Sequence, residues 1–245
     1  MNRRRFLKTA VAAAATPTGN FIPLTDGQSV RIGAREFVLT DIIAPSSHSI
    51  FGGADAGANF ALAALGRILA SGAPASPPAT ARDRWGREMG PARWRLHDGR
   101  ETTLQELLIG AGAARVAPES DDHDFIARCF AIEDRVRAAG VGLWSEADWR
   151  PRDAARAEKS SGYQIYSGVI LKAAERGARV FLNFGEDFRT DFTASVRKGD
   201  FRRWKRKVET AALAGAAAEI RGYVEAINGP SIELLHEMQL RIAKA

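Results

Sequence analysis

Residues 166–196, YSGVILKAAERGARVFLNFGEDFRTDFTASV, determine the fold class of the C-terminal half of the chain. Turn-forming residues separate three runs that are rich in β-branched and aromatic residues: Tyr166–Leu171, Val180–Phe184 and Phe192–Val196. Each run predicts a short strand. Further along, Ile220–Ile227 and Ser231–Leu235 flank Asn228-Gly229-Pro230, and this spacing predicts a hairpin. The C-terminal half is therefore predicted to consist mainly of short strands.

The N-terminal half also contains strand patterns. Residues 30–39 predict two strands around a turn at Gly33. In residues 92–96, ARWRL, apolar and basic residues alternate, which predicts a half-buried strand. Asp98-Gly99 follows directly, so we expect this strand to turn back on itself there.

Three apolar stripes at helical spacing predict helices in the same half. We expect Asp55 to cap the first of them. Cys129 falls within the third stripe, so we predict a core thiol, with a reactive thiol as the alternative. The stripes are Phe60, Ala61, Ala64, Leu65, Ile68 and Leu69; Leu104, Leu107 and Leu108; and Phe125, Cys129, Ile132 and Val136.

Many short strands with an interrupting helix are typical of a small barrel of the oligonucleotide/oligosaccharide-binding (OB) type. We predict a mostly β fold with helices, built as two small OB-like β-barrels. The charged stretch from Arg150 onward has no apolar pattern and predicts a linker at residues 152–163. The N-terminal domain is then residues 21–151 and the C-terminal domain residues 164–245.

Residues 1–20 predict a twin-arginine export signal. Arg3-Arg4 precede Phe6-Leu7-Lys8, an alanine-rich stretch follows, and Ala13–Ala15 fits a cleavage site of the Ala-x-Ala type. This pattern predicts a bacterial protein that is exported in folded form to the periplasm or secreted. The alternative is a basic tail on a cytosolic protein.

The composition excludes several classes of protein. No apolar run approaches the roughly 20 residues that span a bilayer, so we expect no transmembrane segment. A single cysteine excludes an intramolecular disulfide and a cysteine-built zinc site. The net charge of +6 is matched by the basic segment alone, which we define as residues 197–207. Apart from the basic residues at the N-terminus, Arg3, Arg4, Arg5 and Lys8, the net positive charge is therefore concentrated in one segment.

Three stretches, taken in order, resemble the thermonuclease family, whose domains are staphylococcal-nuclease-like. They are Asp26–Val30 with Phe37–Ser46, then Asp83-Arg84-Trp85-Gly86-Arg87, then Ala138–Ser145. The family has there an Asp-Gly-Asp-Thr turn followed by Ile-Asp-Ala-Pro-Glu, an Asp-Arg-Tyr-Gly-Arg motif, and a closing helix with Gly-Leu-Trp. The resemblance covers residues 21–151 and implies a five-stranded OB barrel with three helices. Residues 180–193 with Asn228-Gly229-Pro230 resemble an extension on some exported bacterial members.

The resemblance implies phosphodiester cleavage with a calcium ion, a glutamate general base and two arginines. In this chain Gln28 and Ile43 stand at the positions of two ligand carboxylates, Ser46 at that of the base, and Val38 at that of the first arginine. Isoleucine cannot bind calcium, and a serine hydroxyl is too weakly acidic to act unaided as a base. The resemblance therefore implies a degenerate site without a cofactor, and a protein more consistent with binding than with catalysis.

Two family positions remain occupied by matching residues. Arg87 matches the second catalytic arginine, and Asp26 matches the first acid of the turn. Arg87 has two interpretations, a structural arginine that closes its turn or a residual phosphate contact. Asp26 is interpreted as a turn residue. His48 and His123 have no second histidine at ligand spacing, so we assign no metal site.

The basic segment is the candidate nucleic-acid-binding element. Phe201, Trp204 and Val208 are spaced as one stripe of a helix that Ala211 and Leu213 would extend. Trp204 could stack on bases while the neighbouring cations neutralise phosphates. The alternative is a solvated helix with its aromatic residues turned inward. The candidate binding residues are Arg202, Arg203, Trp204, Lys205, Arg206 and Lys207.

Three functions remain open from the sequence. The first is a non-catalytic periplasmic protein that binds nucleic acid or another polyanion, including anionic lipid, through residues 197–207. The second is an active phosphodiesterase or endonuclease that uses rearranged residues. The third is an interaction module whose partner is an envelope protein.

Overall fold

The structure is a computed structural model of the chain, and it describes residues 21–24, 26–32, 35–47, 53–75, 81–156, 160–187 and 189–243. The predicted export signal, residues 1–20, lies outside the described residues, as do Gly33 and His48. Strands account for about one-third of the structure, and the described residues contain four α-helices. The fold is thus a mixture of strands and helices, as predicted in outline.

The strands of the N-terminal half form three small sheets. They have the orders β1-β2-β3-β7-β6, β5-β8-β9 and β10-β4. The predicted strands of residues 30–39 are β2 and β3, which pair antiparallel, and the predicted strand of residues 92–96 is β8, which turns into β9 at Gly99. The bounds are β1 (Phe21–Pro23), β2 (Ser29–Ile32), β3 (Arg35–Val38), β4 (Ile42–Ile43), β5 (Gly72–Pro74), β6 (Ala81–Arg82), β7 (Glu88–Met89), β8 (Arg93–Leu96), β9 (Glu101–Thr103) and β10 (Arg115–Val116).

Three α-helices and two short 3-10 helices complete this half. Thr103 and Glu106 form a capping box at the start of α2. The expected cap on α1 is wrong, because Gly57 occupies the cap position with a φ of 85° and the Asp55 carboxylate instead accepts from the Ser46 amide. The bounds are α1 (Ala58–Leu69), α2 (Leu104–Gly110), α3 (His123–Ala138), η1 (Gly142–Ser145) and η2 (Ala147–Trp149).

The C-terminal half is one eight-stranded sheet with a single α-helix. Its strand order is β11-β12-β16-β17-β15-β14-β13, and β18 pairs with β16. All the predicted strands of this half are present, and the predicted hairpin is β16 and β17, with Asn228 at a φ of 62° in its turn. The bounds are β11 (Arg152–Asp153), β12 (Tyr163–Val169), β13 (Lys172–Arg176), β14 (Arg179–Asn183), β15 (Thr193–Arg197), α4 (Lys198–Arg203), η3 (Thr210–Leu213), β16 (Ala217–Ile227), β17 (Gly229–Glu233), η4 (Glu237–Gln239) and β18 (Leu240–Ile242).

One expectation about the organisation, the closed barrels, needs correction. The sheets are open, and none of those in the described residues closes into the predicted barrels. In the N-terminal half several strands have only two or three residues, too few for a continuous ladder between sheets. The predicted linker begins inside the C-terminal sheet, because β11 pairs in parallel with β12 and the small Ala154 is fully buried against Gly168.

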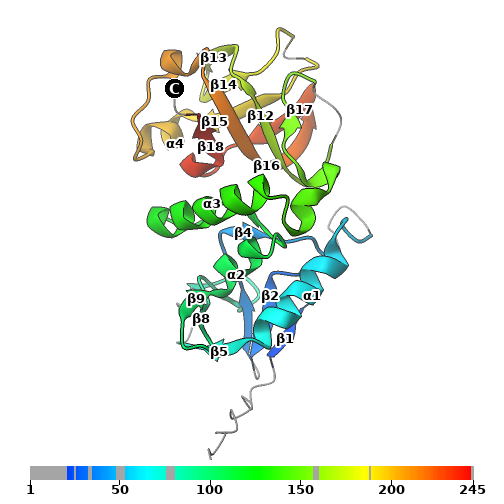
Figure 1. Cartoon of the computed structure of the whole chain (residues 1–245). Helices are drawn as coiled ribbons and strands as arrows, with labels where there is room; N and C mark the ends of the chain where they lie inside the picture. Colours follow the sequence, from blue (N-terminus) through cyan, green and yellow to red (C-terminus); the bar gives the residue numbers. More distant parts are fainter. Residues whose placement is uncertain are drawn as a thin grey trace, which may run out of the picture.

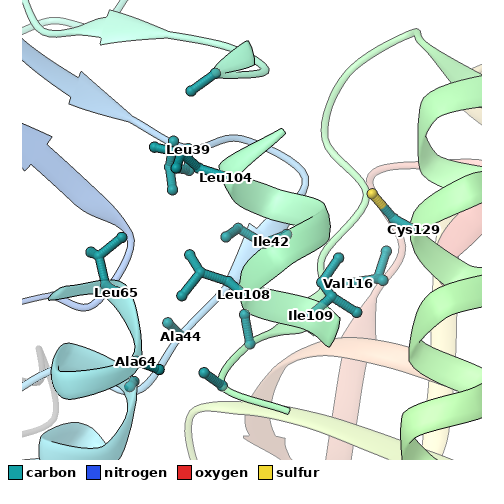
Figure 2. Close-up of a cluster of buried hydrophobic side chains, with 14 of the residues drawn as sticks. Leu39, Ile42, Ala44, Ala64, Leu65, Leu104, Leu108, Ile109, Val116 and Cys129 are labelled. Carbon is teal, nitrogen blue, oxygen red and sulfur yellow. The ribbon is translucent and has the colours of Figure 1, made fainter. Parts of the chain in front are cut away.

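Buried apolar side chains form two clusters, one in residues 30–130 and the other in residues 154–240. Figure 2 shows the first cluster, in which Leu104, Leu108 and Ile109 of α2 lie between Leu65 of α1 and Val116 of β10. Cys129 belongs to this cluster, and its burial raises its pKa to about 12, which confirms the predicted core thiol. No helix among the described residues is both long enough and apolar enough to span a membrane.

Helix α3 lies between the two halves (Figure 1). Phe125, Ile126 and Cys129 face the N-terminal cluster, whereas Glu133 is fully buried and binds Arg221 of β16. We call the contact region between residues 21–151 and 164–243 the seam. The seam positions both regions that the sequence singles out for function.

Candidate functional site

The positions that correspond to the family's metal and base residues lie around one pocket. Asp26, Gln28, Ile43 and Ser46 line a cavity of about 1030 Å³. Residues of the C-terminal half, among them Tyr163, also line this cavity. The fold therefore brings these motif positions together around one cavity, and residues of the C-terminal half complete its lining.

Hydrogen bonds engage the polar groups of the turn at Asp26. The Asp26 carboxylate accepts from the backbone amides of Gln28, at 3.2 Å, and Ser29, at 2.6 Å, and from the Ser29 hydroxyl. The Gln28 side-chain oxygen accepts from the Ala44 amide at 3.1 Å and so ties this turn to the end of β4. These contacts give Asp26 the role of a turn residue, as the sequence indicates.

The neighbouring acids are engaged in the same way. Asp55 accepts from the Ser46 amide at 2.9 Å, and buried Asp41 accepts from the amides of Glu119 and Ser120. Ile43 contributes only apolar surface. Within the described parts of the chain, no three histidine, cysteine, aspartate or glutamate side chains gather as a group that could hold a metal ion.

Arg87 is directed toward its own turn. Its Nε donates to Asp83 at 2.7 Å, and the Asp83 carboxylate also accepts from the backbone amides of Arg87 and Trp85. Burial acts to raise the pKa of Asp83, but these hydrogen bonds outweigh it and hold the pKa below its usual value. Arg87 is not among the described residues that line the pocket. The geometry thus favours the structural interpretation of Arg87, while Val38 lies within β3, also away from the described pocket lining.

Arg115 connects the pocket to the seam. Its guanidinium donates to the Tyr163 carbonyl at 2.9 Å and to the carbonyl of Trp149, and it lies 4.0 Å from the centre of the Trp149 ring. Burial lowers the pKa of Arg115 to about 10, still high enough to keep it charged at neutral pH. Arg115 therefore holds the pocket wall together through carbonyl contacts.

The basic segment is only partly helical. Helix α4 ends at Arg203, and Trp204 has extended backbone angles, so the helix predicted to run on to Leu213 is wrong beyond that point. The reason is that Trp204 turns into the C-terminal core, where it is 6% exposed and packs 4.9 Å from Phe201, centre to centre. The alternative with inward aromatic residues is thus the one observed, and stacking of Trp204 on a base would require it to leave the core.

The cations of this segment remain at the surface. The five cations among the candidate binding residues are exposed, and one of them, Arg203, pairs with Asp200. Arg206 donates to the Leu240 carbonyl at 3.2 Å, Lys207 to the Arg202 carbonyl at 2.8 Å, and the Lys205 ammonium lies 3.4 Å from the Asp121 carbonyl. In the described part of the chain, no carboxylate forms an ion pair within 4 Å of Arg202, Lys205, Arg206 or Lys207. Four of the five predicted cations are therefore available to an external anion.

A buried carboxylate fixes the backbone beneath these cations. Glu237 accepts from the Lys205 amide at 3.0 Å and from the Arg206 amide at 2.9 Å. Its hydrogen bonds hold the segment in place after α4 ends. Local sequence patterns do not single out Glu237, nor Arg221 and Glu133 of the seam, because each becomes important only through a partner about 30 or more residues away. The one available signal was a charged residue at Arg221 between the apolar Ile220 and Val224 of a predicted strand.

Comparison with known proteins gives no assignment: no protein-family model matches the chain, and no match is found among curated proteins.

Proposed function

We propose that this protein is a non-catalytic polyanion-binding protein of the bacterial envelope. The observation that carries the proposal is the exposed row of cations in residues 202–207, four of which form no ion pair with a described carboxylate. Each phosphate neutralised by such a cation releases counterions, which gives a large electrostatic contribution to binding. Because Phe201 and Trp204 face the core, the attraction does not depend on base stacking. Nucleic acid and other dense polyanions both fit this surface.

The engaged acids around the pocket support the absence of catalysis. Of the acids that line the pocket, Asp26 and Asp55 accept backbone hydrogen bonds, and a serine, Ser46, stands at the position of the family's general base. Loss of a general base typically costs about 10²–10⁴ in rate. We therefore expect no calcium-dependent cleavage of nucleic acid above background, and turnover that a chelator abolishes would contradict the proposal.

The strand order supports an OB-like assignment for the C-terminal half. Apart from the two-residue β11, which flanks β12, the sheet runs β13-β14-β15-β17-β16-β12, so the strands at its two ends, β12 and β13, are consecutive in residues 163–176. Between β12 and β13, the Ile170 amide donates to the Ala216 carbonyl and the Leu171 amide donates to the Asn183 carbonyl. Ala216 directly precedes β16 and Asn183 ends β14, so the connection contacts a strand near each end of the sheet. A partly open five-stranded Greek-key barrel would have such a bent first strand. We propose this fold here, a thermonuclease-like domain in residues 21–151, and a domain boundary within residues 152–163 in agreement with the two apolar clusters.

The test is a binding assay with labelled duplex DNA, single-stranded DNA and polyphosphate at several salt concentrations. The triple variant Arg202→Gln, Lys205→Gln, Lys207→Gln removes three exposed cations from the segment. It should bind duplex DNA more weakly, with a salt slope lower by about 0.9 for each phosphate that the variant no longer neutralises.

The matched control is Arg67→Gln, Arg84→Gln, Arg135→Gln, which makes the same change in net charge at exposed positions elsewhere. The control should keep the parent slope. Equal losses in both variants would show that only net charge matters, and an unchanged slope in the first variant would exclude the segment as the binding surface.

A further inference from the structure

Two histidines flank the carboxylate that holds the basic segment. His123 begins α3, and its Nε2 lies 3.4 Å from the Glu237 carboxylate. His236 precedes η4, and the centres of the two histidine rings are 5.1 Å apart. The cluster thus joins the N-terminal half, the C-terminal half and the backbone of the basic segment at one place.

The hydrogen bonding of His236 identifies its neutral form as the one that fits. Its Nδ1 accepts from the Met238 amide at 3.1 Å, so this nitrogen carries no proton. Its Nε2 is buried and has no hydrogen-bond partner among the described residues. A proton on Nδ1 would point at the Met238 N–H and would remove the cap of η4, the helix that begins with Glu237.

The charges around His236 come from several elements. Burial first, and then the nearby His123, lower the pKa of His236, whereas the carboxylates of Glu237, Asp41 and Asp121 act to raise it. Lys205 and Arg206 approach the same cluster because their backbone amides donate hydrogen bonds to the Glu237 carboxylate. The sum keeps the pKa of His236 below its usual 6.5, so the neutral imidazole is favoured in the folded protein at neutral pH.

We propose that His236, His123 and Glu237 form a pH-sensitive clamp that fixes the basic segment at neutral pH and releases it in mild acid. The clamp would regulate the proposed polyanion-binding surface, and in that respect it rests on the proposed function. The clamp itself depends only on the contacts described here.

The direction of the effect follows from proton linkage. The closed clamp binds fewer protons than the open one, so it is most stable above pH 6.5 and is weakened as the pH falls below that value. In acid, the proton on His236 removes the acceptor for the Met238 amide and places a positive charge beside Glu237. The Glu237 carboxylate is then drawn to the His236 imidazolium, and the amides of Lys205 and Arg206 lose their partner.

The test is amide hydrogen exchange at Lys205 and Arg206, expressed as protection relative to the intrinsic rate at each pH. In the parent protein, protection should fall at least about tenfold between pH 7.5 and 5, the equilibrium equivalent of one hydrogen bond to a charged group. Protection of buried Val180 and Leu182 in β14 serves as the reference for global unfolding. A parent protein whose Lys205 and Arg206 protection stays constant, or falls only together with this reference, would overturn the clamp.

The decisive variant is His236→Asn, because an asparagine oxygen can accept the Met238 amide but does not titrate. It should retain protection at pH 5. The exposed His97 provides the control, since His97→Gln should show the same fall as the parent. A fall in His236→Asn equal to that of the parent would also overturn the proposal.

The two proposals fail independently. Hydrogen exchange uses no ligand, so a clamp that responds to pH in a protein that binds no polyanion would contradict only the proposed function. Salt-dependent binding through residues 202–207, combined with constant protection at Lys205 and Arg206, would contradict only the clamp.

Discussion

Trp204 determines which interactions the basic segment can make. It lies in the middle of a run of cations, yet its ring belongs to the apolar core beside Phe201. The ring anchors the chain from below while the charged side chains stay in water. We therefore propose that this surface attracts phosphate groups by charge and does not read bases.

We expect Trp204→Ala to lower the free energy of unfolding by about 3–5 kcal/mol, because it leaves a cavity in the C-terminal core. Its affinity for duplex DNA, measured well below the melting temperature, should change little. Trp85→Ala is the control, since Trp85 is 65% exposed and its loss should cost much less stability. A specific loss of affinity in Trp204→Ala without a loss of stability would instead show that the ring binds the ligand.

Helix α3 is the element that unites the molecule. One side of it completes the N-terminal core, and from the other Glu133 binds Arg221 at 2.9 Å while Asp134 binds Arg241 at 2.6 Å. Arg221 and Glu133 are both fully buried, so each depends on the other to offset the cost of burying a charge. The seam is therefore held by specific ionic contacts as well as by apolar packing.

Two neighbouring residues of α3 allow this to be tested. Glu133→Gln leaves Arg221 buried without its carboxylate at Glu133 and should destabilise the protein by about 3–5 kcal/mol in urea unfolding. Asp134→Asn removes an equal charge from a half-exposed pair and should cost at most about 1 kcal/mol. Similar losses in the two variants would mean that burial does not distinguish these pairs.

At the scale of the whole molecule, stability depends on acids that are paired across the seam. Burial acts to raise the pKa of Glu219, but Arg221 and Arg137 outweigh it and lower the pKa to about 2 from the usual 4.5. The folded state therefore binds fewer protons than the unfolded state between these two values. The stabilisation is complete above pH 4.5 and is lost as the pH falls toward 2.

We expect Glu219→Gln to be less stable than the parent at pH 7, with a difference that shrinks between pH 4.5 and pH 2. The part that disappears should be on the order of 3 kcal/mol. Urea unfolding of both proteins across this range is the measurement, and the exposed Glu225→Gln is the control. A difference that does not vary with pH would contradict the role given to Glu219.

Export also concerns the whole protein. If Arg3-Arg4 belong to a twin-arginine signal, cell fractionation should find the protein in the periplasm without about its first 15 residues. The double substitution of Arg3→Lys and Arg4→Lys, which keeps the charge of the pair, should retain the protein inside the cell. An intact N-terminus on a cytosolic protein would contradict export.

Local patterns in the sequence predicted the elements well. The strands β8 and β16, the hairpin at Asn228 and the buried Cys129 all follow from spacing that the structure preserves. Features that depend on distant partners could not be predicted in this way. Nothing near Trp204 indicates that Glu237 will accept the next two backbone amides, and nothing near Arg115 indicates that the Tyr163 carbonyl will accept from its guanidinium.

The buried pair of Glu133 and Arg221 also means that each half of the protein supplies a charge that the other half needs. A fragment that ended near residue 156 would present Glu133 to solvent and lack its cation, while the remaining fragment would expose Arg221 and the seam face of its sheet. Two such fragments, made separately, carry complementary surfaces that only the other can cover. The protein is thus a candidate for fragment complementation, and we expect that mixing the two fragments would restore the buried Glu133–Arg221 pair.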